Sequence, residues 1–176
     1  MFIGHLPAGY VANDLLQRSC WRFLDESERR LTTRVMLAGS LAPDLDMFYF
    51  YLGDGGRTHH HLFWPHLPAV WVGIGAGLAI CGALLKSRRM LLADVALMAA
   101  VFLHFICDTI VGGIAWWYPW SSSLVMWFEV PARFRPWWLS FFLHWTFLFE
   151  VAVIVWAAVI FRRRRRARRA RAGVGD

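Results

Sequence analysis

Three long apolar stretches constrain this chain more than any other feature of its 176 residues. Residues 67–85 carry no charge, and residues 90–111 and 137–161 contain only two or three ionisable side chains each. A helix needs about 20 apolar residues to cross a bilayer core of about 30 Å. The sequence therefore predicts an all-α fold, an integral membrane helical bundle with at least three membrane spans.

The amino-acid composition agrees with a membrane-embedded chain. Hydrophobic residues make up 58% of the sequence and the mean hydropathy is +0.42, whereas soluble domains are about 45–50% apolar. The length predicts one domain. Because the three cysteines lack CxxC spacing, we expect small buried apolar residues and neither a zinc ribbon nor a disulfide framework.

The positive charge is concentrated near the C-terminus. Residues 161–171 hold eight of the 19 Lys and Arg residues, and without these eight the net charge of +7 becomes −1. Basic segments beside membrane spans stay in the cytoplasm, which places residues 86–89 and the tail there and the Trp-rich loop 112–136 outside. We therefore divide the chain into a membrane-embedded helical domain, residues 1–161, and a cytoplasmic arginine-rich tail, residues 162–176. The tail is expected to attract anionic lipid, and no nucleic acid partner is expected.

Two further helices are predicted before the apolar stretches, over residues 11–24 and 28–41. The second must end before Pro43, which disfavours helical geometry in the residue before it. We expect these five helices to run alternately up and down in chain order, which gathers the basic clusters of the helix ends and the tail at one end and all seven histidines at the other. At a rise of about 1.5 Å per residue, His104 lies roughly 22 Å beyond Arg89. This separation predicts that the histidines form one candidate functional site, at the end of the bundle in the outer part of the bilayer.

His104 and Asp108 form the first candidate pair on that face. Ionisable side chains inside membrane spans are costly, so their default interpretation is functional. The two residues are one helical turn apart on one face, so both can reach one ion. The alternative is that Asp108 only orients the imidazole of His104.

Asp44 and Asp46 form the second candidate pair. They follow Pro43 in chain expected to be extended, where alternate side chains point the same way. Both are therefore predicted ligands. The alternative is a turn at a helix end with two solvated acids.

The histidines of the N-terminal half are further candidates. His59, His60 and His61 are consecutive, so one or two of them are expected as ligands, unless the run lies by accident on the surface. His5 is a candidate that depends on its neighbours. His66 follows a proline at the start of a span and is the least favoured ligand.

Three other ionisable groups lie in the predicted spans. His144 is either a ligand or an interhelical hydrogen-bonding group. Glu150 is expected to be buried against a neighbouring helix. Asp94 lies near the basic end and is expected to pair with Arg88 or Arg89.

A mixture of imidazole and carboxylate ligands indicates the kind of cofactor. It suits a divalent zinc, manganese or iron ion better than a metal that selects thiolates, with zinc foremost. Such an ion can activate water near neutral pH. Two other classes stay open: a haem-binding electron carrier with His104 and His144 as axial ligands, and a membrane metal transporter or sensor without turnover.

Several short motifs occur in an order that resembles a known family. They are Gly4-His5, Ala42-Pro43-Asp44-Leu45-Asp46, Arg57-Thr58-His59-His60-His61, His104-x-x-x-Asp108 and Tyr118-Pro119-Trp120. In this order they are similar to the bacterial membrane-bound, metal-dependent hydrolases (YdjM-like). The family has a Ser where this chain has His60, and the His-Arg that usually precedes the Thr is missing, so which of the three histidines binds stays open.

The resemblance implies an all-helical fold and phosphoester hydrolysis, through the family's similarity to zinc-dependent phospholipases C. Those enzymes also carry a His-x-x-x-Asp on a helix, as His104 and Asp108 do, whereas their later His-x-x-x-Glu is absent here. The expected catalytic residues are Asp46, His104 and Asp108. The expected metal ligands are Asp46, His60, His104 and Asp108, followed by His5, Asp44 and His59.

These observations predict a multi-pass hydrolase of the bacterial inner membrane. Its site faces the extracytoplasmic side and its C-terminus is cytoplasmic. A metal-activated water would attack a phosphoester or another ester of a small-molecule or lipid substrate, and membrane lipids are its expected surroundings.

Overall fold

The computed structural model describes residues 3–53, 60–136 and 138–172, and this part of the chain is helical, as predicted. Its seven α-helices are α1 (His5–Arg18), α2 (Glu26–Gly39), α3 (Asp46–Leu52), α4 (Pro68–Leu84), α5 (Arg88–Thr109), α6 (Trp138–Phe142) and α7 (Phe147–Ala172). Three short 3-10 helices, η1 (Pro43–Leu45), η2 (His60–Leu62) and η3 (Trp64–His66), lie between α2 and α4.

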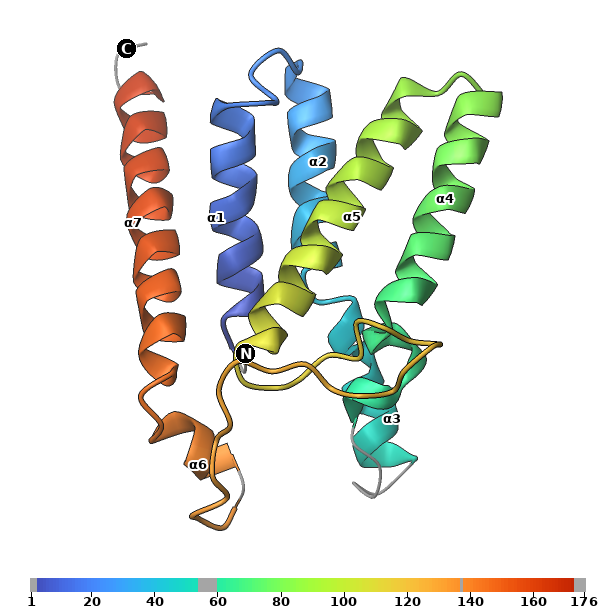
Figure 1. Ribbon diagram of the computed structural model, residues 1–176. Coiled ribbons are helices and arrows are strands. Elements are labelled where there is room, and N and C mark those ends of the chain that lie inside the picture. Colours follow the sequence, from blue (N-terminus) through green and yellow to red (C-terminus); the bar gives the residue numbers. More distant parts are fainter. Residues whose placement is uncertain (1–2, 54–59, 137, 173–176) are drawn as a thin grey trace.

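The five longer helices stand side by side and run alternately in opposite directions (Figure 1). α5 packs against α2 and α4, and α1 packs against α2, α5 and α7. The C-terminal end of α7 and the α1–α2 and α4–α5 turns share one end, while α3, α6 and the long loop after α5 share the other. The helices thus follow the predicted up-and-down order.

Local sequence explains where α2 and α5 begin. Asp25 and Glu28 form a capping box, in which the Glu28 N–H donates to Asp25 Oδ1 (2.8 Å) and the Asp25 N–H to Glu28 Oε2 (3.2 Å). Ser87 caps α5 by accepting from the Met90 N–H. Arg88 also donates to Glu28 Oε1 at 2.8 Å, so the starts of α2 and α5 are tied together at the basic end.

Small residues allow the central helices to approach closely. A Cβ added at Gly39 would lie 3.0 Å from the Cβ of Ala100, and one added at Gly9 would lie 2.7 Å from the Cβ of Ser40. Membrane helices without a hydrophobic driving force between them pack in this way. Met36 and Ala100 are fully buried in the resulting contact between α2 and α5.

The ends of the first two helices differ from the prediction. The helix expected over residues 11–24 begins at His5 and ends at Arg18, and the one expected over residues 28–41 is Glu26–Gly39. Asp25, Glu26 and Ser27, which lie between the two predicted helices, instead cap α2 and begin its first turn, because Asp25 accepts from the backbone of that turn.

The chain after Pro43 is helical, not extended as predicted. Pro43 begins η1, where its fixed φ and missing N–H are tolerated, and α3 follows at once from Asp46. Asp44 and Asp46 are therefore arranged by helical turns, and the period-two argument for placing them on one side was wrong.

The apolar stretch 137–161 is also interrupted. It forms α6, a turn over residues 143–146, and the first half of α7. His144 Nδ1 contacts Thr146 Oγ1 at 2.8 Å within this turn, a local bond that competes with the helical pattern. The arginine run continues α7 without a break, so the helix extends past residue 161, where the tail is predicted to begin.

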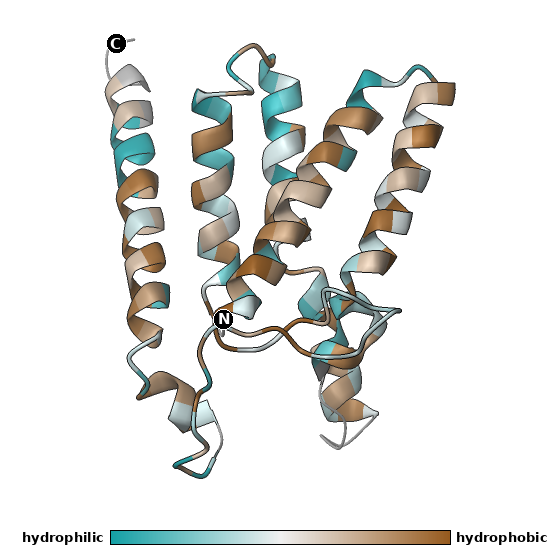
Figure 2. Ribbon diagram, viewed as in Figure 1, coloured by the Kyte–Doolittle hydropathy of each residue, from teal (hydrophilic) through white to brown (hydrophobic). Residues whose placement is uncertain are grey.

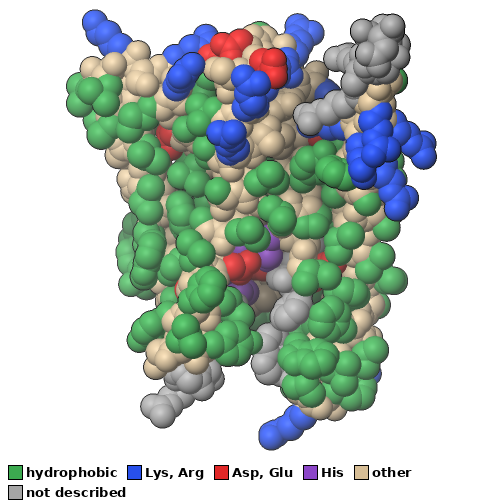
Figure 3. Space-filling model, turned by 180° about the vertical axis from the view of Figure 1, so that it is seen from behind, with side chains coloured by type: hydrophobic (Ala, Val, Ile, Leu, Met, Phe, Trp, Pro, Cys, Tyr) green, Lys and Arg blue, Asp and Glu red, His purple; other side chains and the backbone are tan. Residues whose placement is uncertain are grey.

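Among the described helices, α5 alone is long and apolar enough to cross a bilayer. α4 is apolar but has 17 residues. Hydrophobic residues fill the middle of α4, α5 and α7, and hydrophilic ones gather at the helix ends near the C-terminus (Figure 2). Seen from behind, apolar side chains cover the side of the bundle, and Lys and Arg side chains gather at its upper end (Figure 3).

Candidate metal centre

Histidine and aspartate side chains from four regions meet at the end of the bundle opposite the arginine-rich end of α7. His5 begins α1, and His104 and Asp108 lie on the last turns of α5. Asp44 and Asp46 belong to η1 and the start of α3, while His61 and His66 belong to η2 and η3. We call these seven residues the His/Asp cluster.

Asp108 lies at the centre of the cluster. Its Oδ1 is 3.1 Å from His5 Nε2, and its Oδ2 is 3.0 Å from His104 Nε2. The same Oδ2 is 3.6 Å from His66 Nε2 and 3.8 Å from His61 Nε2. All five side chains are buried, with no more than 5% of any residue exposed. One carboxylate therefore faces four imidazoles in a site shielded from solvent.

In three of the histidines, the ring nitrogen that faces away from Asp108, Nδ1, is hydrogen-bonded to an oxygen outside the centre of the cluster. His104 Nδ1 donates to the carbonyl oxygen of Ser40 (2.9 Å), and His61 Nδ1 donates to that of Gly113 (2.7 Å). His66 Nδ1 pairs with Asp46 Oδ2 at 2.6 Å. A carbonyl can only accept, so Nδ1 of His104 and His61 carries the proton, and in the neutral ring the Nε2 lone pair is directed at the centre.

Asp44 is the most open member of the cluster. Its Oδ1 lies 3.7 Å from His104 Nε2 and 3.8 Å from His66 Nε2, and its side chain is 32% exposed. In the view from behind, Asp or Glu and His atoms are visible in a hollow on the lower part of the apolar flank (Figure 3). The cluster thus has an opening on the side of the bundle.

Close backbone approaches hold the imidazoles in place. A Cβ added at Gly112 would collide with Cε1 of the His61 imidazole. Only glycine at this position therefore leaves room for that ring. Gly113 has φ +74°, a left-handed conformation that glycine adopts without strain. The loop after α5 can therefore turn back over the cluster and offer its carbonyls to His61.

The donor set fits a divalent metal ion. Two groups have ligand atoms within 4.8 Å of one another: His5, Asp44 and His104, and His61, His66 and Asp108. Two ligands at tetrahedral angles and about 2.05 Å from zinc are roughly 3.3 Å apart. The 3.4 Å between His104 Nε2 and His66 Nε2, and the Nε2–Oδ2 separations of Asp108, are close to this value. Imidazole and carboxylate donors with no thiolate suit zinc, manganese or iron.

The charge state of His66 shows how strongly the carboxylates act. Burial disfavours its charged form, but hydrogen bonds and Coulombic attraction from Asp108 and Asp46 outweigh this and raise the pKa of His66 to about 9. Without an ion, a proton on His66 balances part of the carboxylate charge.

The structure brings five of the predicted residues together: His5, Asp44, Asp46, His104 and Asp108. Their contacts differ, because Asp46 contacts His66 and belongs to neither ligand group. His59 lies outside the described residues. The backbone of His60 lies in η2, and its side chain is outside the described part.

Sequence reasoning missed His66 and left His61 undecided. His66 was the least favoured ligand, yet it is fully buried beside Asp46 and Asp108. The signal was Pro65: together with Trp64 it forms the 3-10 turn that aims His66 inward and not along α4.

Three other polar residues lie apart from the cluster. Glu150 accepts from the Ile3 and Gly4 N–H groups at 2.7 and 3.0 Å, so α7 holds the segment that leads into His5. The predicted pairing of Asp94 with Arg88 or Arg89 is wrong, since these arginines contact Glu28 and Ser27. His144, bonded to Thr146, joins neither ligand group.

Fold and site together define a helical bundle with a buried cluster of histidine and aspartate at one end of its described part. The chain belongs to the YdjM inner membrane protein family, which it matches over residues 2–172. It is therefore an inner membrane protein. No curated protein sequence and no solved structure matches it.

Proposed function

We propose that this chain is a membrane-bound metal-dependent hydrolase that acts on a phosphoester or lipid-like substrate. One observation carries the proposal. His61, His66 and His104 each have Nδ1 held by a carbonyl or carboxylate while Nε2 faces Asp108. Metal-binding histidines are oriented in this way, whereas an ordinary buried histidine needs no such convergence.

The residues of the cluster have distinct proposed roles. His5, His61, His66, His104 and Asp108 would supply the ligands of the ion, and Asp46 would fix the ring of His66. When bound, a divalent ion supplies Lewis acidity and activates water near neutral pH. Asp44, the partly exposed carboxylate, would accept the proton of the attacking water.

The surroundings of Asp44 favour an apolar substrate. The neighbouring side chains Leu45 and Phe48 are 61% and 68% exposed. A substrate that enters from the side of the bundle would therefore meet apolar groups before the cluster. This agrees with a lipid-like phosphoester, which the resemblance to zinc-dependent phospholipases C also implies, and zinc is the proposed ion.

We also propose that α4, α5 and α7 cross the membrane and that the cluster faces the extracytoplasmic side. The basic α4–α5 turn and the arginines of α7 lie at the opposite end of the bundle. Basic segments beside spans stay in the cytoplasm, which also places the C-terminus there.

A membrane metal transporter or sensor is the second candidate, since it would use the same ligands without turnover. The partly exposed Asp44 favours the hydrolase, because a carboxylate at the opening has a role in proton transfer. The haem alternative has less support: it needs His144 on a helix facing His104, and His144 lies in the turn before α7.

The test compares metal content and hydrolysis of phosphoesters by purified protein in detergent. His104→Ala should lose both the bound metal and activity. Asp44→Asn should keep metal when zinc is in excess but lose about 100-fold or more in turnover, the usual contribution of a general base. His144→Ala, a histidine outside the cluster, is the matched control and should retain both.

Two results would count against the proposal. Metal-loaded wild-type protein that hydrolyses no phosphoester above the His104→Ala background would leave a binding protein, not a hydrolase. Equal activity of wild type and Asp44→Asn would remove Asp44 from the chemistry.

A further inference from the structure

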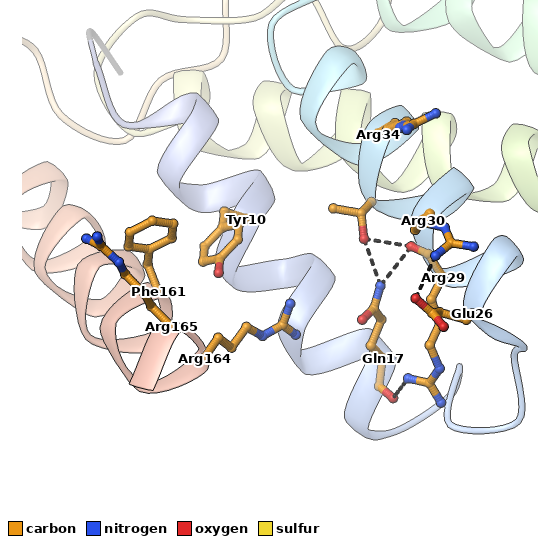
Figure 4. Close-up of a pocket in the computed structure, with 10 residues that line it drawn as sticks. Tyr10, Gln17, Glu26, Arg29, Arg30, Arg34, Phe161, Arg164 and Arg165 are labelled. Atoms are coloured by element: carbon orange, nitrogen blue, oxygen red, sulfur yellow. Dashed lines mark hydrogen bonds and ion pairs between the residues drawn. The ribbon is translucent and has the colours of Figure 1, made fainter. Parts of the chain in front are cut away.

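A groove at the opposite end of the molecule gathers cations from two helices. It has a volume of about 600 Å³ and runs along α1 between α2 and α7 (Figure 4). Its charged lining is Glu26, Arg29, Arg30 and Arg34 of α2, and Arg164 and Arg165 of α7. Five arginines face one glutamate, so the groove is strongly positive and suits an anion.

Helical spacing aligns these side chains. Arg30 and Arg34 are one turn apart on α2, and Phe161 and Arg165 are one turn apart on α7. α1 forms the floor, with Tyr10 and Gln17 separated by two turns on one face. The two walls lie on either side of α1, and Figure 4 shows the Arg164 side chain extending into the space beside Tyr10, whereas Arg34 and Arg165 point outward from the two walls.

Three of the five arginines lack a carboxylate partner in the described residues, and one of these, Arg29, donates to backbone carbonyls instead. Arg34 and Arg165 form no ion pair there, whereas Arg30 pairs with Glu26 at 2.6 Å and Arg164 pairs with buried Asp14. The groove therefore keeps positive charge that its own side chains do not neutralise.

Arg29 stabilises the packing of α2 against α1, so its guanidinium is not available to a ligand. Its guanidinium donates to the carbonyl oxygens of Leu24 and Gln17 at 2.9 and 3.3 Å. Gln17 in turn donates to Thr33 Oγ1 at 2.9 Å. These bonds fix the position of α2 beside α1, and with it the positions of Arg30 and Arg34.

Polar and apolar parts of the groove are separated along the helix axes. Tyr10 lies two turns nearer the middle of the bundle than Gln17, and the Arg164 guanidinium lies 5.8 Å from the centre of its ring. Phe161, 56% exposed, lies one turn nearer the middle than Arg165. A free anion would use only the arginines, whereas a lipid would also use the aromatic surface below them.

We propose that this groove binds the phosphate head group of an anionic phospholipid in the leaflet at the arginine end. Arg164, which extends into the groove, contacts the phosphate, because the planar guanidinium matches phosphate oxygens in paired hydrogen bonds, and Arg30, Arg34 and Arg165 add positive charge around it. The first part of an acyl chain lies along Tyr10 and Phe161. The site is distinct from the His/Asp cluster and requires no hydrolytic activity.

The test uses the full chain in neutral detergent, titrated with dioctanoyl phosphatidylglycerol, dioctanoyl phosphatidylcholine or inorganic phosphate. The measurement is the rise in thermal midpoint with ligand concentration, which reports binding to the folded state. We expect saturable stabilisation by phosphatidylglycerol and none by phosphatidylcholine. Inorganic phosphate should require at least about tenfold higher concentration, since it gains nothing from the aromatic surface.

The variant Arg30→Gln/Arg34→Gln/Arg165→Gln should weaken phosphatidylglycerol binding at least about tenfold, since each arginine near a lipid phosphate contributes about a factor of five. The matched control, Arg163→Gln/Arg166→Gln/Arg169→Gln, removes the same charge from α7 outside the groove and should change binding less than about twofold.

Three results would overturn the proposal. Equal loss in both variants would show that net charge alone attracts the lipid. Phosphate binding as tight as that of phosphatidylglycerol would show an anion site without lipid. Equal stabilisation by phosphatidylglycerol and phosphatidylcholine would show that the groove does not recognise the anionic head group.

Discussion

Asp108 is the residue on which the cluster depends, because its two oxygens face imidazoles from α1, η2, η3 and α5. A buried carboxylate in an apolar bundle needs compensating charge. The histidines supply it by carrying protons or by sharing a cation. Asp46 differs, since it contacts only His66 Nδ1 and its Oδ1 has no hydrogen-bond partner among the described residues.

The variant Asp46→Asn tests this division. An asparagine can still accept from His66 but lacks the charge, so metal affinity should fall about 10–100-fold and recover with excess metal. Titration with zinc and elemental analysis would measure it. Asp94→Asn, a buried carboxylate nearer the other end of α5, is the control and should bind as wild type does. Loss of metal that no excess restores would make Asp46 a ligand itself.

Residue by residue, the sequence predicts the pair on one helix best. His104 and Asp108 could be placed together because an i, i+4 spacing determines the face. The contribution of His66 depends on a 3-10 turn, which no spacing rule contains. Asp44 and Asp46 were singled out for a wrong geometric reason, since η1 replaces the expected extended chain.

At the scale of elements, α7 holds the start of α1 in place. Glu150 accepts two backbone N–H groups from Ile3 and Gly4, immediately before His5. The contact joins segments far apart in sequence, and the prediction that Glu150 is buried against a neighbour is confirmed, with 5% of the residue exposed.

Glu150→Ala should therefore loosen His5 without touching the cluster. Removing the acceptor leaves two N–H groups to find new partners, so we expect zinc affinity to fall about tenfold, as for other residues that orient ligands. Competition with a chromogenic chelator measures the affinity. Glu129→Ala, an exposed acid in the loop after α5, is the control. Unchanged zinc affinity in Glu150→Ala would mean that α7 does not position His5.

The five longer helices could be predicted from apolar runs and charge, whereas the elements near the cluster could not. α3 and the 3-10 helices are short and lack a repeating apolar pattern. The break between α6 and α7 depends on a local bond between His144 and Thr146 inside an apolar stretch. A hydropathy average over the whole stretch does not detect a break that depends on one local hydrogen bond.

At the scale of the whole molecule, the two ends of the bundle have opposite chemistry. Arginines surround one end and the His/Asp cluster lies near the other, with apolar flanks between them. The sequence predicted this separation because adjacent helices alternate in direction. It also sets the two proposed sites, for lipid and for metal, far apart.

Cysteine labelling tests the proposed orientation. In a background with exposed Cys20 and Cys81 replaced by serine, Ser122→Cys should react with a membrane-impermeant maleimide added to intact cells. Ala170→Cys should react only after the membrane is opened, because arginine-rich segments stay in the cytoplasm. Reaction of both cysteines from outside, or of neither, would reject this orientation.

The most direct test of the central claim, a metal ion held by this cluster, is X-ray absorption on zinc-loaded protein together with elemental analysis. We predict bound zinc surrounded by nitrogen and oxygen at about 2.0–2.1 Å, with imidazole scattering and no sulfur at about 2.3 Å. His104→Ala should lose the metal. Zinc bound through sulfur, or the same zinc content and spectrum in wild type and His104→Ala, would contradict the account.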